Sequence, residues 1–184
     1  KKKHLITPEK NLMKLVLTLY AALIVFLFGV LLPIALMIKL PIKKFIQAIR
    51  EPVSIAFATT SSDSALPKAL ENMEKFGVPR KIVSFVIPTG YTFNLDGTTL
   101  YLSLASVFVA QAAGIHMSIG AQITMGLILM LTSKGVAAVP RASLVILIAT
   151  ADQFHLPVWP IAAIFGIDEL MDMARTSVNV IGNT

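Results

Sequence analysis

An uncharged stretch at residues 15–38 restricts the folds that this chain can adopt. As a helix rising 1.5 Å per residue, it is long enough to cross roughly 30 Å of hydrocarbon, and it is too long for the core of a signal peptide. A buried helix of a large soluble protein is the alternative. Composition favours lipid, because 55% of the 184 residues are hydrophobic and only 14% are charged, whereas soluble domains carry about a quarter charged residues.

Positive charges are distributed unevenly along the chain, whose formal net charge is +6. Lysine and arginine gather at 39–50 and 68–81 and are missing from 112–121 and 152–165. This asymmetry is typical of cytoplasmic loops rather than of a phosphate-binding face, so we expect a multi-pass protein of the cell (inner) membrane and no nucleic-acid partner. The lysines of 1–14 do not fit this asymmetry, and we interpret residues 1–11 as a linker from a region missing here.

Two hydroxyl-rich segments, 59–64 and 132–135, interrupt the apolar stretches that follow the first helix. Their flanks are too short to cross a bilayer, which predicts two re-entrant helical hairpins. Between them an apolar helix is interrupted from Pro88 to Gly97. We therefore expect an all-α membrane protein with a helix at 12–40, a hairpin at 41–78, a broken helix at 80–112, a second hairpin at 118–156 and a polar helix at 158–184.

The order of these segments, hairpin and broken helix followed by hairpin and polar helix, is that of a pseudo-inverted repeat. Paired interrupted segments in corresponding halves indicate the central binding site of a transporter. A channel can also use re-entrant loops, but the chain has no matching filter sequence. A serine hydrolase built on Ser61 or Ser62 would need His4, His116 or His155 as its base, and all three lie at or beyond segment ends. We expect no enzyme activity and no cofactor.

The last helix carries a polar stripe at helical spacing, formed by Asp168, Asp172, Arg175, Thr176, Asn179 and Asn183. A charge at the bilayer centre costs roughly 2.5–3.5 kcal/mol, so these groups need partners or water. The planar fork of Arg175 suits a carboxylate, and Asp172, one turn earlier, is placed to accept from a substrate ammonium. The alternative is an internal salt bridge from Arg175 to Asp168 or Asp172 that only holds helices together.

Oxygen-bearing side chains near the two interruptions are candidate cation ligands. They are Asn94, Asp96, Asn179 and Asn183. Such hard ligands suit Na⁺ or a proton-linked site, and they are poor ligands for zinc because no histidine or cysteine lies near them.

The chain resembles the glutamate transporter family, the dicarboxylate and amino acid:cation symporters, in its bacterial proton/sodium-glutamate symporter type. The matching motifs are Thr60-Ser61-Ser62 with Leu66-Pro67, Asn94-Leu95-Asp96-Gly97-Thr98, Ser133-Lys134-Gly135 through Val139-Pro140, and 168–183. The resemblance implies that 12–184 is a partial transport domain, which moves like an elevator against a trimeric scaffold that the sequence lacks. It also implies a homotrimer, a lipid bilayer and a small acidic solute as partners.

The same resemblance implies roles for individual residues. Arg175 would hold the side-chain carboxylate of the substrate and Asp172 its amino group. Further substrate contacts would come from Thr98, Thr176 and Asn179, and from the backbone of Ser62 and Val139. One cation site would consist of Gly90, Asn94, Asn179 and Asn183. A second would use mainly backbone carbonyls of Thr92, Leu95, Ser133, Lys134 and Val136, and a third Asn94 with Asp96.

Departures from the family pattern bear on the coupling ion and on the substrate. Asn183 stands where sodium-coupled members often have Asp, which favours proton coupling, and Arg141 and Ala138 are unusual at the second hairpin tip. Asp172 favours an acidic amino acid, since carriers of dicarboxylates often have Ser there. We therefore expect H⁺- or Na⁺-coupled symport of glutamate or aspartate. The alternatives are a C4-dicarboxylate:cation symporter and, more remotely, a substrate-gated anion channel.

Overall fold

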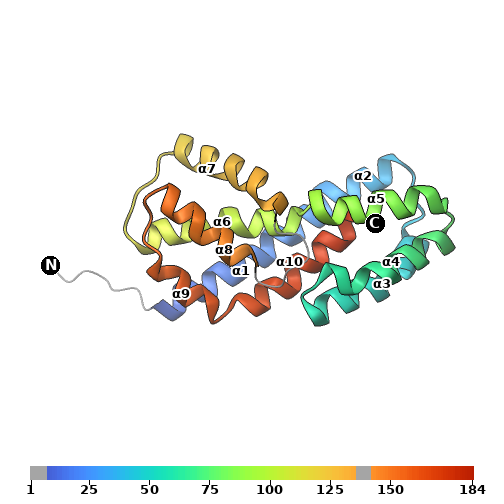
Figure 1. The fold of residues 1–184 in the computed structure, drawn as a ribbon, viewed down its shortest axis with the longest axis horizontal. Helices are drawn as coiled ribbons and strands as arrows, with labels where there is room; N and C mark the ends of the chain where they lie inside the picture. The colour runs from blue at the N-terminus through green and yellow to red at the C-terminus, as the bar shows by residue number, and fades with distance from the viewer. Residues whose placement is uncertain (1–7, 136–141) are drawn as a thin grey trace.

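The computed structural model describes residues 8–135 and 142–184, and helices joined by short connections make up these ranges (Figure 1). The prediction of an all-α protein is confirmed for this part of the chain. Four residues with predicted roles lie outside the described residues, namely Val136, Ala138, Val139 and Arg141. Most of the predicted linker at residues 1–11 also lies outside them.

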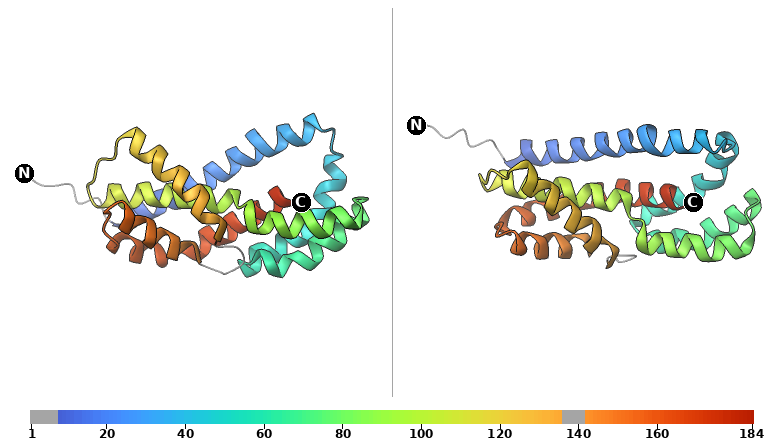
Figure 2. Two further views of the ribbon diagram at one scale, coloured as in Figure 1. Left: turned by 45° about the horizontal axis from the view of Figure 1, so that its top comes forward. Right: turned by 90° about the horizontal axis from the view of Figure 1, so that it is seen from above.

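The N-terminal helix is long and consists of three parts: α1 (Pro8–Phe26), a π-helix (Leu27–Leu31) and α2 (Leu32–Met37). Residues 11–37 form a candidate membrane span of 27 residues, which contains an 18-residue stretch with a mean hydropathy of 2.8. Pro33 explains the π-helix, because a proline ring clashes with the carbonyl four residues earlier and a wider turn relieves that clash. Figure 2 shows this helix along one side of the molecule.

A helical hairpin follows, formed by α3 (Ile42–Thr59) and α4 (Ser62–Phe76), which lie side by side in Figure 1. Thr60 turns the chain in the left-handed conformation (φ 53°), and the Ser61 hydroxyl caps α4 by accepting from the Ser64 N–H at 3.4 Å. This cap is the reason that α4 begins at the tip itself. Buried alanines bring the two helices close together.

The broken helix consists of α5 (Arg80–Phe93) and α6 (Asp96–Ala112). The interruption is confined to Asn94 and Leu95, whereas the sequence suggested that it would begin at Pro88. Pro88 instead lies within α5, where the Thr89 hydroxyl donates to the Phe85 carbonyl at 2.6 Å, beside the hydrogen bond that the proline cannot form. Hydroxyl groups of this kind allow apolar helices to continue through proline.

Four further helices complete the described fold: α7 (Ile119–Thr132), which leads into a 3-10 turn (Ser133–Gly135), α8 (Ala142–Gln153), α9 (Trp159–Phe165) and α10 (Asp168–Asn183). Helices α7 and α8 both pack against α6. The segment expected as one polar helix, 158–184, is two helices. Gly166 and Ile167 separate them. The Ile167 N–H donates to the Ile164 carbonyl at 2.9 Å, and this hydrogen bond ends α9.

Helix α10 joins two hydrophobic clusters that together form the core. Met171 and Val178 belong to a cluster formed with α1, α6, α7, α8 and α9, and Val180 belongs to a second cluster formed with α3, α4 and α5. In Figure 1 this red helix runs through the middle of the elongated body. Because it packs on both clusters, α10 buries ten of its sixteen residues, including the polar side chains that face α6.

Candidate functional site

The polar stripe of α10 is buried inside the protein. Asp168 is fully buried, Arg175 is 2% exposed and Asp172 4% exposed, and the remaining polar members of the stripe are also buried. The stripe faces α6 and the interruption between α5 and α6, where backbone groups without helical partners are available. Buried charges of this kind need paired or hydrogen-bonded surroundings.

The Arg175 guanidinium lies between two carboxylates. Its Nε donates to Asp172 Oδ1 at 3.1 Å, Nη1 donates to Asp168 Oδ1 at 3.1 Å and Nη2 donates to Asp168 Oδ2 at 3.5 Å. All three residues lie on α10, so these ion pairs do not tie one helix to another. Of the five N–H donors of an arginine, three are used within the described part of the chain, which leaves two for another acceptor.

Helix α6 packs directly against this arginine. The Arg175 guanidinium carbon lies 3.9 Å from the centroid of the Tyr101 ring, in cation–π geometry. One turn earlier, the backbone carbonyl of Arg175 lies where a Cβ atom of Gly97 would be, so only glycine permits this approach. Backbone and side chain of Arg175 are therefore both held by the first turns of α6.

Asn179 links α10 to the start of α6. Its Oδ1 accepts from the Gly97 N–H at 2.8 Å and the Thr98 N–H at 3.3 Å, and its Nδ2 donates to Thr98 Oγ1 at 2.8 Å. The first N–H groups of a helix have no partner within that helix. A side chain of α10 thus caps α6.

Asn183 reaches the other side of the interruption. Its Nδ2 donates to the backbone carbonyls of Asn94 at 2.9 Å and Asn179 at 2.8 Å. Its Oδ1 lies so close to Gly90 that a Cβ there would be 2.5 Å away. The structure thus brings together Gly90, Asn94, Asn179 and Asn183, the four residues expected to form one cation site, around a single amide group.

Several other predicted site residues of the described ranges lie around the same interruption. The Leu95 carbonyl accepts from the Thr99 hydroxyl at 2.9 Å, and that hydroxyl lies 3.4 Å from the buried Ser133 hydroxyl. The carboxylate of Asp96 lies against Gly182, since Oδ2 would be 2.9 Å from a Cβ there.

The remaining described members of the predicted site are Thr176, Thr92, Lys134 and Ser62. Thr176 donates to Asp172 Oδ1 at 2.9 Å, and Thr92 donates to the Pro88 carbonyl at 3.3 Å. Lys134 lies half-buried in the 3-10 turn, which packs against α5. Ser62 is buried in the first turn of α4, and none of its described hydrogen bonds reaches α10.

Three contributors to the site were not assigned a role from the sequence. Asp168 was considered only as a member of the stripe and as a possible salt-bridge partner of Arg175, and the structure confirms that pairing at 3.1 Å. Tyr101 and Gly97 carry no local signal for their contacts with Arg175. These contacts depend on how α6 packs against α10.

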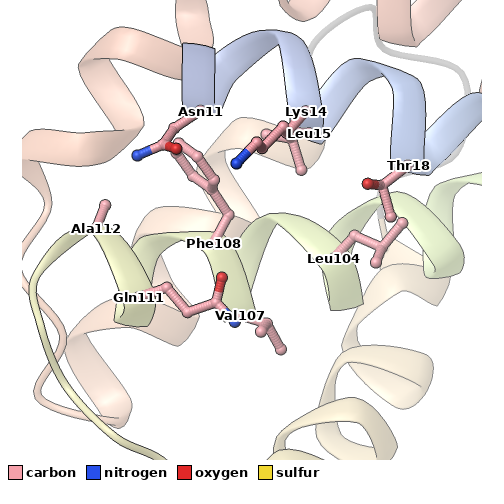
Figure 3. Close-up of a pocket in the computed structure, with 9 residues that line it drawn as sticks. All are labelled: Asn11, Lys14, Leu15, Thr18, Leu104, Val107, Phe108, Gln111 and Ala112. Carbon is pink, nitrogen blue, oxygen red and sulfur yellow. The ribbon is translucent and has the colours of Figure 1, made fainter. Parts of the chain in front are cut away.

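A separate cavity lies between α1 and α6, with a volume of about 440 Å³ (Figure 3). It is lined by Asn11, Lys14, Leu15, Thr18, Leu104, Val107, Phe108, Gln111 and Ala112. None of these residues belongs to the predicted site. The cavity is thus distinct from the polar cluster around Arg175.

Comparison with known proteins gives consistent matches along nearly the whole chain. The model of the sodium:dicarboxylate symporter family matches residues 5–184. The proton/sodium-glutamate symport protein of Bacillus caldotenax is 50% identical over 173 residues, which is 94% of this chain and 41% of that protein. The proton/glutamate-aspartate symporter of Escherichia coli (strain K12) is 46% identical over 172 residues, 94% of this chain and 39% of that protein.

A relative named for a different substrate is equally similar. The C4-dicarboxylate transport protein of Pectobacterium atrosepticum is 49% identical over 171 residues, 92% of this chain and 40% of that protein. The chain therefore spans 39–41% of the length of these relatives.

Proposed function

Since this chain belongs to the sodium:dicarboxylate symporter family, we propose that it forms the substrate-binding part of a transporter that couples the uptake of glutamate or aspartate to Na⁺ or H⁺. The family consists of transporters rather than enzymes, in line with the expectation from the sequence. The polar cluster on α10 and at the interruption of α5 and α6 is the proposed binding site.

The observation that carries this proposal is the setting of Arg175. Its guanidinium is buried, its orientation is fixed by Asp168, Asp172 and Tyr101, and two of its N–H donors remain available within the described structure. The remaining Nη2 N–H lies on the same edge as Nε, and the remaining Nη1 N–H lies on the opposite edge, so either can donate a charge-assisted hydrogen bond to a substrate carboxylate. A neutral amino acid would leave those donors without an acceptor, which makes its binding unfavourable.

Asp172 supports an amino acid as the substrate. Its carboxylate lies beside the Arg175 Nε, at 3.1 Å, so a substrate whose side-chain carboxylate reaches Arg175 brings its ammonium group to the same end of the stripe. We assign Thr98, Thr176 and Asn179 to the surrounding polar contacts, together with backbone groups of Ser62 and Val139.

The carbonyl oxygens around the Asn183 amide support a cation site next to the substrate. Asn183 Nδ2 donates to the carbonyl oxygens of Asn94 and Asn179, and these two oxygens would become cation ligands if the amide rotated to turn its Oδ1 toward them. We assign Gly90, Asn94, Asn179 and Asn183 to one site. Thr92, Leu95, Ser133, Lys134 and Val136 are assigned to a second, and Asn94 with Asp96 to a third.

The proposed assembly follows the family pattern. The two hairpins would be re-entrant, the protein would cross the membrane several times, and residues 12–184 would move as an elevator against a scaffold that forms a homotrimer. The apolar helix at 11–37 supports membrane insertion, because its length exceeds the hydrocarbon thickness.

A C4-dicarboxylate symporter is the second candidate, favoured by the Pectobacterium relative. Uptake by the intact transporter in proteoliposomes distinguishes the two candidates, with labelled aspartate, glutamate and malate offered under a Na⁺ gradient or an H⁺ gradient alone. We expect uptake of the two amino acids, abolished in Arg175→Ala and absent from protein-free vesicles. Uptake of malate alone would establish the second candidate, and anion flux without saturable exchange would indicate a channel.

A further inference from the structure

The base of the α3–α4 hairpin contains a polar pocket that plays no part in the proposed transport site. Its volume is about 440 Å³. It is lined on α3 by Lys44, Gln47, Ala48, Arg50 and Glu51, and on α4 by Asn72, Lys75 and Phe76. Three of these side chains are cationic and one is anionic, so the lining carries a formal charge of +3 − 1 = +2.

The ion pairs around the pocket leave two of its cations without a carboxylate. Glu51 pairs with Lys68 at 3.3 Å, and Glu71 pairs with both Lys68 and Lys75. Lys44 and Arg50 have no ion pair within residues 8–135 and 142–184. The pocket therefore offers an ammonium and a guanidinium that no carboxylate of the described residues neutralises.

The pocket is built on a rigid base. The Asn72 amide donates across the hairpin to the Ala48 carbonyl at 2.8 Å, which fixes the separation of the two helices. Beneath it, the rings of Phe45 and Phe76 pack edge to face with their centroids 6.1 Å apart. The cations thus project from two helices whose spacing is fixed, rather than from a loop.

We propose that this pocket binds a phosphate group. The Arg50 fork suits two phosphate oxygens, Lys44 and Lys75 add charge, and the amide of Gln47 adds neutral donors. Basic pockets between helices at the cytoplasmic membrane surface commonly hold lipid phosphates, and this pocket lies in the lysine- and arginine-rich part of the chain. The phosphate comes from an anionic phospholipid or from a soluble phosphate, and the experiment separates these sources.

Native mass spectrometry of the intact transporter, after exchange into phosphatidylglycerol or phosphatidylcholine, counts the lipids that each protomer retains. Calorimetry with inorganic phosphate tests the soluble source. The double variant Lys44→Gln/Arg50→Gln is compared with the charge-matched control Lys43→Gln/Lys81→Gln, whose cations are exposed and lie outside the pocket. Aspartate affinity, measured in parallel, shows that each variant is folded.

We expect the pocket variant to lose affinity for its phosphate ligand at least tenfold and the control to change less than twofold, with aspartate affinity unaltered in both. Retention of phosphatidylglycerol without binding of inorganic phosphate identifies a lipid headgroup, and the reverse identifies a soluble phosphate. Equal losses in the two variants would mean that overall surface charge accounts for binding. That outcome, or the absence of binding by either ligand, would overturn the proposal.

Discussion

Asn179 and Thr98 exchange hydrogen bonds in both directions across the interface of α10 and α6. The Asn179 Nδ2 donates to Thr98 Oγ1 at 2.8 Å, and the Thr98 N–H donates to Asn179 Oδ1 at 3.3 Å. The same oxygen accepts from the Gly97 N–H at 2.8 Å. One amide side chain therefore satisfies three polar groups at the start of the second half of the broken helix.

Replacing Asn179 by alanine should destabilise the protein strongly. The change leaves buried donors at Gly97 and Thr98 without acceptors, and each such loss costs about 1–3 kcal/mol, so we expect the free energy of unfolding to fall by about 2–4 kcal/mol. Equilibrium unfolding of the intact transporter, followed by circular dichroism, measures the loss. Asn72→Ala is the control, because it removes one half-buried bond to Ala48 and should cost about 1 kcal/mol. Equal losses in the two variants would contradict this account.

Arg175→Ala should abolish binding of acidic substrates, because the carboxylate loses its charged hydrogen-bond donor. Arg175→Lys keeps the charge without the fork, so we expect aspartate affinity to fall about 10–100-fold, as for one or two charged hydrogen bonds. Isothermal titration calorimetry measures both effects, and Arg80→Ala, on the exposed start of α5, serves as control. Unchanged affinity in Arg175→Lys would show that the site assignment is wrong.

Asp172→Ser should change the preference between substrates. An ammonium loses its carboxylate partner, whereas a dicarboxylate loses nothing, so glutamate affinity should drop at least about tenfold while malate affinity holds or rises. Ser177→Ala is the control, because it removes a hydroxyl of the same helix that donates to the Met173 carbonyl at 2.8 Å and lies outside the proposed site. Competition between malate and labelled glutamate measures the ratio. Parallel losses of both ligands would assign Asp172 to support of Arg175 rather than to the ammonium.

Asn183→Asp should increase the sodium dependence of transport. The variant places a carboxylate oxygen beside the carbonyls of Asn94 and Asn179, which now accept from the Asn183 amide at 2.9 and 2.8 Å. Three oxygens repel one another unless a cation or a proton lies among them. Uptake measured against Na⁺ concentration at fixed pH provides the test. An unaltered sodium response would remove the argument that Asn183 selects the coupling ion.

Gly97→Ala should separate α6 from α10. The new Cβ overlaps the backbone carbonyl of Arg175, and overpacking of this kind costs about 1–3 kcal/mol. Gly126→Ala is the control, because its nearest neighbour, the Ser103 hydroxyl, would lie 4.0 Å from the new carbon and alanine favours a helix. Unfolding and aspartate affinity measure the effect, which should appear in Gly97→Ala alone.

Local patterns in the sequence predicted the features that depend on local physics. The uncharged residues 15–38 predicted the long apolar helix, and the spacing of polar residues from 168 to 183 predicted one face of α10. The family prediction is also confirmed. The sequence predicted a wider interruption than the structure has. Pro88 and Gly90 break helices in water, but they stay helical here because hydroxyl groups and neighbouring helices support the backbone.

Contacts between distant segments could not be predicted in this way. Nothing near Tyr101 or Gly97 in the sequence indicates that Arg175, more than seventy residues later, lies against both. The sequence offered Asp168 or Asp172 as a salt-bridge partner of Arg175, and the structure pairs it with both, which depends on rotamers that packing selects. The separation of α9 from α10 also depends on a turn at Gly166 and Ile167 that apolar periodicity does not reveal.

The two-residue interruption at Asn94 and Leu95 has an electrical consequence. A helix carries about half a negative charge at its carboxyl end and about half a positive charge at its amino end. Helix α5 ends and α6 begins at this gap, so opposite ends of two dipoles lie side by side where little solvent screens them. A cation drawn to the end of α5 and a carboxylate drawn to the start of α6 would each strengthen the field that holds the other. If the proposed site binds both a cation and a carboxylate, the broken helix would make their binding cooperative without any movement of the chain.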